Sequence, residues 1–334
     1  MTPHAVDVYT TDGSKLAYRG QVALVGGRLE RVPDASDPEN ADQLEMVLAT
    51  TMPQGEDPEA WLTYAVTCLH NQSITVLPAD GGEDYAGPAR ALGEYGPSKA
   101  TTLIYPESHE DKVRTALARH SVGPEHVASL VGAPDDAKVY LSHRGTGDGT
   151  SHKDAVRVSV YHPHFGIVRA AGVTPKNAER DLGVTANGRH YVENVGLYLR
   201  PERQGSGMGR DMFARQVENL VKHGGFNYIR THAAREGAPG RPYAGYYVWP
   251  LMGYDQRVEH FANSQPGQAE LYSKIKAAYP HAESVLDIYD RGGKEWWKEH
   301  GGDMIFARFD LTPGSRSLEV LNKYLASKGA QPQR

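Results

Sequence analysis

The sequence has little of what membrane-spanning, disulfide-stabilised or secreted proteins need. Its 334 residues contain no apolar run of about 18 residues, which excludes an ordinary transmembrane helix. The single cysteine, Cys68, forms neither an intramolecular disulfide nor a cysteine-rich zinc site. The N-terminus lacks the basic and then apolar pattern of a secretory signal, so we expect a cytoplasmic protein.

Excess positive charge is also missing. The chain has 36 Lys and Arg against 41 Asp and Glu, a formal net charge of -5. This balance argues against a protein that coats nucleic acid, but it does not exclude a small anionic ligand. We therefore expect neither a nucleic-acid partner nor a membrane partner.

Local patterns predict alternating helices and strands before residue 134 and mainly strands after it. In the first part, they predict strands near 21–24, 73–77 and 101–105 and helices at 57–69 and 110–120. In the second part, they predict strands at 138–142, 156–160 and 191–199, a hairpin partner for 156–160 within 166–173, and a loop over 174–188. We therefore predict an N-terminal α/β region at 1–133 and a second domain from residue 134.

The most informative segment, residues 203–210, lies between the predicted strand at 191–199 and a helix. Its alternating glycines, Gly205, Gly207 and Gly209, allow a tight turn that exposes backbone N–H groups. The start of the helix adds partial positive charge, so the segment predicts an anion cradle, with phosphate as the obvious ligand. Arg210 follows Gly209 where a nucleoside-triphosphate loop needs Lys, and the glycine spacing also differs from the dinucleotide-binding fingerprint.

The segment resembles the central motif of the GCN5-related N-acetyltransferase (GNAT) superfamily, [Gln/Arg]-x-x-Gly-x-[Gly/Ala], at Gln204, Gly207 and Gly209. A following strand at 226–233 and a helix at 243–254 that ends in Gly253-Tyr254 extend the resemblance. It implies the α/β acyl-CoA N-acyltransferase fold: a mixed, mostly antiparallel sheet flanked by helices and splayed at the cofactor site, with an N-terminal α/β extension.

The implied GNAT-like domain spans 134–313 and carries an insertion at about 256–303. A last strand is expected at 304–311. A C-terminal helix and tail follow at 314–334, with the helix at 317–325. The insertion includes the helical stretch 282–290 and the segment 294–298, which contains two tryptophans.

The resemblance also implies the residues that bind acetyl-CoA, the acyl donor. The strand end would bind the pantetheine arm through its backbone, and the glycine loop would bind the pyrophosphate. These residues are Leu197, Tyr198, Leu199, Gln204, Gly205, Ser206, Gly207, Met208, Gly209 and Arg210.

Acetylation of an amine requires a base, a donor for the oxyanion and an acid for the thiolate. By resemblance to histone-type members, Glu193 is the candidate base, with its pKa raised by burial; a solvent-facing strand carboxylate is the alternative. Trp249 stands where many relatives have the tyrosine acid, so Tyr246 or Tyr247 is the candidate, with core or pocket-wall packing as the alternative. A backbone N–H of Leu199 is the expected oxyanion donor.

These features predict an acetyl-CoA-dependent N-acetyltransferase that acts on a primary amine of a small molecule or peptide. No convincing cysteine nucleophile is present, which favours direct transfer in a ternary complex. A catalytically degenerate GNAT-like module with a structural or interaction role is the alternative, and transfer of a longer acyl chain also stays open. His162-x-His164 lacks a third ligand, so we expect no metal site. The acceptor and the oligomeric state stay open.

Overall fold

The computed structural model describes most of the chain from residue 89 onward and only strands before it. The described residues are 5–12, 15–25, 28–31, 74–78, 89–105, 107–144, 155–162, 164–165, 167–169, 172–174, 178–199, 205–234, 245–262 and 268–329. For the strands before residue 79 and those within 167–174, the description covers the backbone. The predicted helix at 57–69, Cys68 and Gln204 lie outside the described residues.

The chain divides into two compact units, and the first comprises residues 1–85, 161–177 and 198–206. It contains an antiparallel sheet of order β3-β2-β1-β4 and a separate hairpin of β8 and β9. The bounds are β1 Ala5–Asp12, β2 Lys15–Val25, β3 Arg28–Arg31, β4 Ile74–Pro78, β8 Ile167–Arg169 and β9 Gly172–Thr174. β2 and β4 confirm the strands predicted near 21–24 and 73–77.

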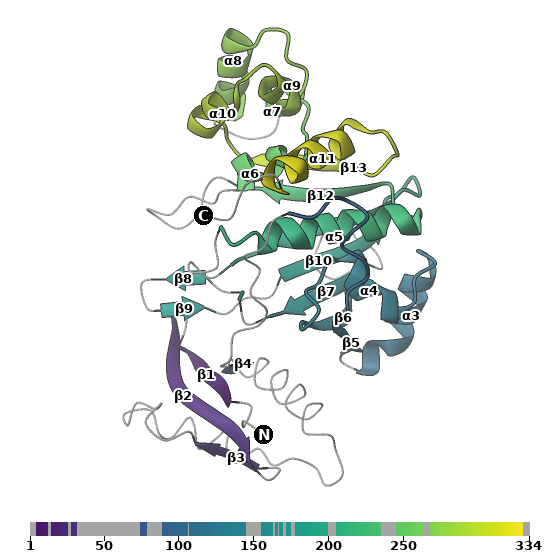
Figure 1. The fold of residues 1–334 in the computed structure, drawn as a ribbon, viewed down its shortest axis with the longest axis vertical. Helices are drawn as coiled ribbons and strands as arrows, with labels where there is room; N and C mark the ends of the chain where they lie inside the picture. The colour runs from purple at the N-terminus through teal and green to yellow at the C-terminus, as the bar shows by residue number, and fades with distance from the viewer. Residues whose placement is uncertain are drawn as a thin grey trace. The chain divides into compact units, whose positions relative to one another are not determined.

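The second unit comprises residues 86–160, 178–197 and 207–334 and is built on a seven-stranded sheet (Figure 1). The strand order is β13-β12-β11-β10-β7-β6-β5. The bounds are β5 Thr101–Ile104, β6 Lys138–Arg144, β7 Ala155–Tyr161, β10 Ala178–Val184, β11 His190–Gly196, β12 Tyr228–Ala233 and β13 Met304–Asp310. β11 and β12 are parallel, as are β5 and β6, whereas β10 is antiparallel to β7 and β11, and β13 to β12.

The sheet is therefore mixed, as expected. Because β5 pairs with β6, the second unit begins before residue 134, the position at which the sequence pattern predicts the start of the second domain.

Two predictions for the middle of the sheet are wrong. β7 does not form a hairpin with 166–173; it pairs with β10, while β8 and β9 pair with each other. The predicted loop at 174–188 contains β10. This strand shows no apolar alternation because it buries Arg180 and Asp181, which are 3% and 0% exposed, among its apolar residues. Because of these buried charged residues, the apolar pattern does not predict β10, although this strand pairs with a neighbour on each side.

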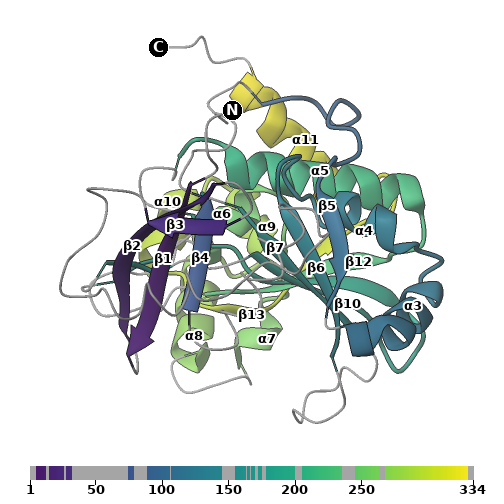
Figure 2. The same ribbon diagram turned by 90° about the horizontal axis from the view of Figure 1, so that it is seen from below.

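Helices flank this sheet. Figures 1 and 2 both show α5 lying across its strands, and α3 and α4 beside β5 and β6. The bounds are η2 Glu107–His109, α3 Glu110–Ala118, α4 Pro124–Leu130, α5 Met208–His223, α6 Gly245–Leu251, α7 Glu259–Ala262, α8 Gln268–Ala278, α9 Val285–Asp290, α10 Lys294–His300 and α11 Arg316–Gly329.

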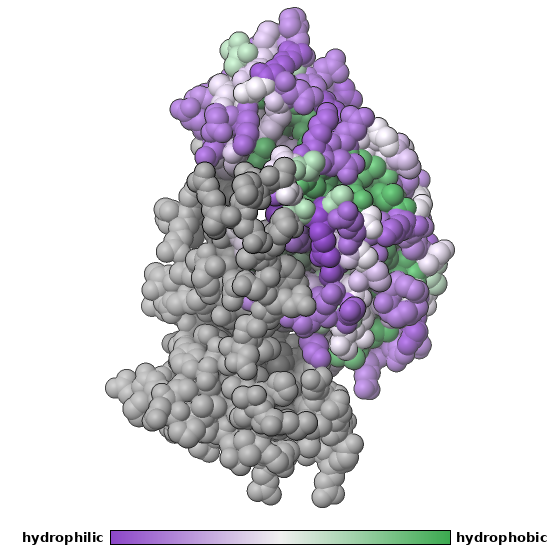
Figure 3. Space-filling view, viewed as in Figure 1, coloured by the Kyte–Doolittle hydropathy of each residue, from purple (hydrophilic) through white to green (hydrophobic). Residues whose placement is uncertain are grey.

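The expected insertion at 256–303 contains α7 to α10, and its surface in Figure 3 is mainly hydrophilic. Trp297 of α10 is fully buried. The helix α9 begins with a capping box between Ser284 and Asp287. The predicted helix at 317–325 is confirmed as α11. Among the described residues, no helix is both long and apolar enough to cross a membrane.

Local sequence explains where α5 begins and ends. Gly207 precedes it with a φ of 94°, a left-handed value that favours glycine. Gly224 ends it with a φ of 72°, and its N–H donates to the Leu220 carbonyl, as a C-terminal glycine does. Met212, Phe213, Val217 and Leu220 are buried, so α5 fixes the glycine loop to the core.

Candidate functional site

The glycine loop turns directly into α5. Gly205 has a φ of 80° and Gly207 a φ of 94°, so each adopts a left-handed conformation. The Asp211 N–H donates to the Gly207 carbonyl and forms the first helical hydrogen bond. The N–H groups before it have no acceptor within the helix, and Gly207, the N-cap residue, has no side chain that could cap them. The start of α5 therefore has the backbone donors and the dipole of an anion-binding helix N-terminus.

Arg210 adds a guanidinium to this end of α5. Its Nε lies 2.7 Å from Oδ1 of Asp211, which also accepts a hydrogen bond from the Tyr95 hydroxyl at 3.2 Å. The guanidinium covers Gly207: a Cβ at that position would lie 2.6 Å from Arg210 Nη2. Arg210 is therefore held beside the backbone of the predicted cradle.

β11 is distorted near its end. Glu179 pairs with Gly196 and Arg180 with Asn194, so one step along β10 corresponds to two along β11 and leaves Val195 as the extra residue of a β-bulge. On the other side of β11, the parallel pairing with β12 ends at Asn194 and Thr231, although the strands continue to Gly196 and Ala233. Beyond Asn194 and Thr231, the two parallel strands are therefore no longer paired with each other.

The expected pantetheine-binding residues, Leu197 to Leu199, follow this point, because β11 ends at Gly196 and not at Leu199. Leu199 forms an isolated bridge with Phe165. The N–H of Leu197 makes no hydrogen bond within the described part of the chain. An unpaired backbone donor thus follows directly after the bulge.

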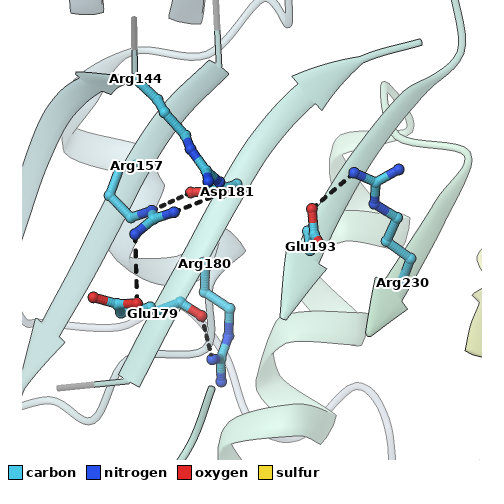
Figure 4. A network of polar contacts seen from close by, with 7 residues as sticks. All are labelled: Arg144, Arg157, Glu179, Arg180, Asp181, Glu193 and Arg230. Carbon is cyan, nitrogen blue, oxygen red and sulfur yellow. Dashed lines mark hydrogen bonds and ion pairs between the residues drawn. The ribbon is translucent and has the colours of Figure 1, made fainter. Parts of the chain in front are cut away.

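Glu193 belongs to a row of charged residues on one face of the sheet. The register aligns Arg157, Asp181, Glu193, Arg230 and Arg308 on five adjacent strands. Glu193 accepts a hydrogen bond from Arg230 at 2.8 Å, and both side chains are about one-quarter exposed (Figure 4). Glu193 is therefore partly buried and ion-paired, which lies between the buried base and the solvent-facing carboxylate that the sequence left open.

The neighbouring acid in this row, Asp181, is completely buried between two arginines. Arg144 and Arg157 both donate to its carboxylate, and Arg157 also lies 3.4 Å from Glu179 (Figure 4). Asp181 is the direct cross-strand neighbour of Glu193. Two carboxylates side by side repel each other, so the flanking guanidinium groups are what makes this arrangement stable.

The opposite face carries a buried polar network. Asn194 Nδ2 donates to Gln216 Oε1 at 3.0 Å and to the Tyr254 hydroxyl at 2.8 Å, and Gln216 donates back to Asn194. The Thr231 hydroxyl donates to the Asn194 carbonyl at 2.7 Å. Burial raises the pKa of the Tyr254 hydroxyl far above its usual range, so this tyrosine stays protonated. The network joins both parallel strands to α5 just before they separate.

Gly253 and Tyr254, which end the α6 region, have packing roles. Gly253 has a φ of 96°, and a Cβ there would lie 2.3 Å from the Ser317 carbonyl oxygen. Only glycine permits this close approach to the start of α11. Tyr254 is fully buried and contacts Phe213 and Phe309 through its ring.

The two candidate acids differ in their surroundings. The Tyr246 hydroxyl donates to the Lys298 carbonyl at 2.6 Å, and the Tyr246 carbonyl accepts from Trp297, which ties the residue to α10. Tyr247 is half-buried, and Lys294 and Lys298 lie 5.8 and 5.3 Å from the centre of its ring. Trp249 packs against Phe213 and Tyr254. These contacts favour Tyr247 over Tyr246 as the candidate acid.

Tyr324 of α11 was not among the residues predicted from the sequence. Burial raises the pKa of its hydroxyl; Arg210 and Lys294 oppose this shift, and Asp211 and Tyr247 add to it. Tyr324 therefore lies within electrostatic range of both the start of α5 and the candidate acid. No local motif marks it, because α11 reaches this region only through the tertiary fold.

The paired histidines contact each other. The rings of His162 and His164 are 4.7 Å apart, and the His164 N–H donates to His162 Nδ1. Among the described residues, no group of three or more His, Cys, Asp or Glu side chains is arranged to hold a metal ion.

No protein-family model matches the chain, and no curated protein matches it significantly. Among solved structures, it is similar to a protein assigned to the GNAT acetyltransferase family from Desulfovibrio desulfuricans, with 14% identity, a TM-score of 0.23, and coverage of 63% of this chain and 97% of that chain. Nourseothricin acetyltransferase has 12% identity, a TM-score of 0.20, and coverage of 42% and 86%.

The loading GNATL domain of CurA from Lyngbya majuscula has 10% identity, a TM-score of 0.20, and coverage of 46% and 76%. Similarities of this size carry no argument about activity. Any functional conclusion therefore depends on the residues of this chain.

Proposed function

We propose that this protein transfers an acetyl group from acetyl-CoA directly to a primary amine of a small molecule or peptide. The observation that carries the proposal is the end of β11. There the pairing of two parallel strands stops, the Leu197 N–H has no acceptor among the described residues, and the chain continues into a helix that follows a left-handed glycine. This combination suits an extended thioester ligand whose pantetheine arm leads to a pyrophosphate.

Binding of the donor is assigned to two backbone segments. The N–H groups at the start of α5, from Gly207 to Arg210, would hold the pyrophosphate, with the Arg210 guanidinium beside them. Gln204, Gly205 and Ser206 complete the proposed loop, and Leu197 to Leu199 would follow the pantetheine arm. Leu197, not Leu199, is the better oxyanion donor, since the Leu199 backbone is engaged with Phe165.

In the proposed reaction, Glu193 accepts one proton from the acceptor ammonium group, directly or through water. The free amine then forms a C–N bond to the thioester carbon while the Leu197 N–H stabilises the negative charge that develops on the oxygen. The C–S bond breaks, the thiolate takes a proton from Tyr247, and Tyr247 regains a proton from the second proton that the nitrogen loses. Glu193 then releases the proton that it accepted to the solvent. The products are an amide, the free thiol of CoA and one proton.

Calorimetric titration with acetyl-CoA, desulfo-CoA and ATP tests the first part of the proposal. We expect both CoA ligands to bind and ATP to fail. Gly207→Ala should weaken acetyl-CoA affinity about tenfold or more, because the new Cβ collides with Arg210 and the left-handed φ is strained. Gly188→Ala is the matched control, because Gly188 has a φ of 78° with no atom near its missing Cβ.

Turnover tests the second part, with polyamines, aminoglycosides and peptide amines as acceptors. Glu193→Gln and Tyr247→Phe should each lower kcat by about 100-fold, the usual scale for removing an acid or a base. Tyr246→Phe should destabilise the contact with α10 and leave kcat within about twofold.

Absence of acetyl-CoA binding at millimolar concentration would instead favour the alternative, a structural or interaction module that keeps only the fold. If Gly207→Ala and Gly188→Ala weaken the affinity for acetyl-CoA equally, the glycine loop is not the pyrophosphate-binding site.

A further inference from the structure

Arg180 of β10 is a buried cation without an acidic partner. It is 3% exposed, and its Nη1 donates to two carbonyl oxygens, those of Glu179 and Gly196, each at 2.8 Å. Its Nε is buried without an acceptor, and no carboxylate pairs with it among the described residues. Burial lowers the pKa of Arg180 to about 10. A buried charge of this kind is costly to the fold, so its presence requires a reason.

The position of its acceptor supplies that reason. The Gly196 carbonyl stands at the β-bulge, where the extra residue Val195 disrupts the regular ladder between β10 and β11. Arg180 bonds to carbonyls on both strands across this irregularity. Its guanidinium therefore fixes the direction of the Gly196 carbonyl where the bulge leaves backbone geometry least determined.

Gly196 and Leu197 share one peptide group. In a planar trans peptide, the C=O and the following N–H point in opposite directions. Because the Gly196 carbonyl points to Arg180, the Leu197 N–H points away from it, and this N–H is the unpaired donor described above. A charge-assisted hydrogen bond to the carbonyl also polarises the peptide group and makes its N–H a stronger donor.

We propose that Arg180 is a positioning residue for acyl transfer: it holds and polarises the Gly196–Leu197 peptide group so that the Leu197 N–H stabilises the negative charge on the thioester oxygen. This inference rests on the proposed function. The hydrogen-bond donor is the backbone N–H of Leu197, and the proposal adds that the charge of Arg180, on the adjacent strand β10, positions this donor.

The test compares Arg180→Lys, Arg180→Gln and Arg180→Met in the full chain. Arg180→Met should lower kcat about tenfold or more and leave the KM for acetyl-CoA within about twofold, because the donor acts mainly on the transition state. Arg180→Gln should resemble Arg180→Met, since it keeps a donor but loses the charge. Arg180→Lys should recover most of the activity.

Arg215→Gln is the matched control. Arg215 is also buried, and it donates to the Ala133 carbonyl and to Asp135, each at 2.8 Å. This variant should lose stability and keep kcat. Thermal unfolding of every variant separates loss of fold from loss of rate.

A second readout does not depend on turnover. In the free protein, the Leu197 amide proton resonance should move upfield in Arg180→Met and Arg180→Gln and much less in Arg180→Lys. An unmoved resonance, or full kcat in folded Arg180→Met, overturns the inference. Weaker acetyl-CoA binding with unchanged kcat also overturns it, whereas failure of the unmodified protein to bind acetyl-CoA overturns the proposed function itself.

Discussion

The two faces of the seven-stranded sheet accommodate arginine in different ways. On one face, Arg144 and Arg157 bond to Asp181, and Arg230 bonds to Glu193, so each of these three guanidinium groups has a carboxylate. On the other face, which we call the buried face, Arg180 bonds to carbonyl oxygens and has no carboxylate partner within the described ranges. Ion pairing explains how the sheet tolerates the arginines of the first face, but it does not explain Arg180. The comparison therefore identifies Arg180, beside the bulge, as a charge whose role lies outside the stability of the sheet.

The largest expected loss of stability is on the face where arginines pair with carboxylates, which we call the paired face. Asp181→Ala should lower the free energy of unfolding by about 3–5 kcal/mol, because it leaves two guanidinium groups without their shared carboxylate. Urea unfolding measures this change. Glu110→Ala, which removes an exposed ion pair with Arg114, should cost only about 0.5 kcal/mol. A loss below about 1 kcal/mol for Asp181→Ala would show that the paired face does not depend on its buried acid.

The polar network of the buried face comes next. Asn194→Ala should cost about 2–3 kcal/mol, since Gln216 and Tyr254 lose a buried partner. Urea unfolding of Asn194→Ala, Gln216→Ala and the double variant measures the coupling between the two amides. The double variant should lose less than the sum of the single losses, and strict additivity would contradict a cooperative network.

A buried histidine near the start of β11 should make the stability of the fold depend on pH. His120 is 3% exposed, and its Nδ1 lies 2.9 Å from Nδ1 of His190. Burial, followed by the charges of His190, His223 and Arg119, lowers the pKa of His120 to about 4 from an ordinary value near 6.5.

The unfolded chain therefore binds a proton that the native state does not bind. The contribution of His120 is complete above pH 6.5 and is lost as the pH falls toward 4, by about 2 kcal/mol at pH 5. Urea unfolding at pH 7.5 and pH 5 measures the loss, and His120→Phe should reduce it. The same loss in both proteins would assign the acid sensitivity to other groups.

Removing the partly exposed ion pair between Arg230 and Glu193 should lower stability less. Arg230→Met should cost about 1 kcal/mol or less, because solvent screens its pair with Glu193. The stacking of Arg230 over Tyr191, at 4.1 Å, is lost as well. Urea unfolding in low and in high salt should show a smaller difference between the proteins in high salt. A cost above about 3 kcal/mol would place this pair in the same class as Asp181.

The smallest expected change in stability belongs to Arg180. Arg180→Met should stay within about 1 kcal/mol of the unmodified protein, in either direction, because an apolar side chain avoids the cost of burying a charge. Urea unfolding of Arg180→Met and of the unmodified protein measures this difference in free energy. A loss as large as that of Asp181→Ala would show that Arg180 is retained for the fold, and the contrast between the two faces would disappear.

Features governed by neighbouring residues could be predicted from the sequence. The glycines around α5, its buried helical stripe and its glycine stop all depend on contacts within a few residues. The strand at β13 and the helix α11 were predicted for the same reason. The segment that carries Glu193 is also predicted as a strand, although its predicted end lies three residues beyond Gly196, where β11 ends.

Features that depend on pairing between distant segments could not be predicted. β10 looked like a loop because its charged residues gain partners only after folding: Asp181 from β6 and β7, and Arg180 from the end of β11. The same holds for the choice between Tyr246 and Tyr247, which depends on the contact of Tyr246 with α10, and for Tyr324, which α11 brings near Arg210.

The amino-acid sequence alone predicts the glycine loop, the helix that follows it and an anionic ligand at the start of that helix. These depend on backbone conformations that adjacent residues impose. The fold was needed to show that β11 carries a bulge, that its pairing with β12 stops at Asn194, and that a buried guanidinium holds the Gly196 carbonyl. Hydrogen bonding between strands and the burial of charge are set by segments far apart in the chain, so no local pattern contains them.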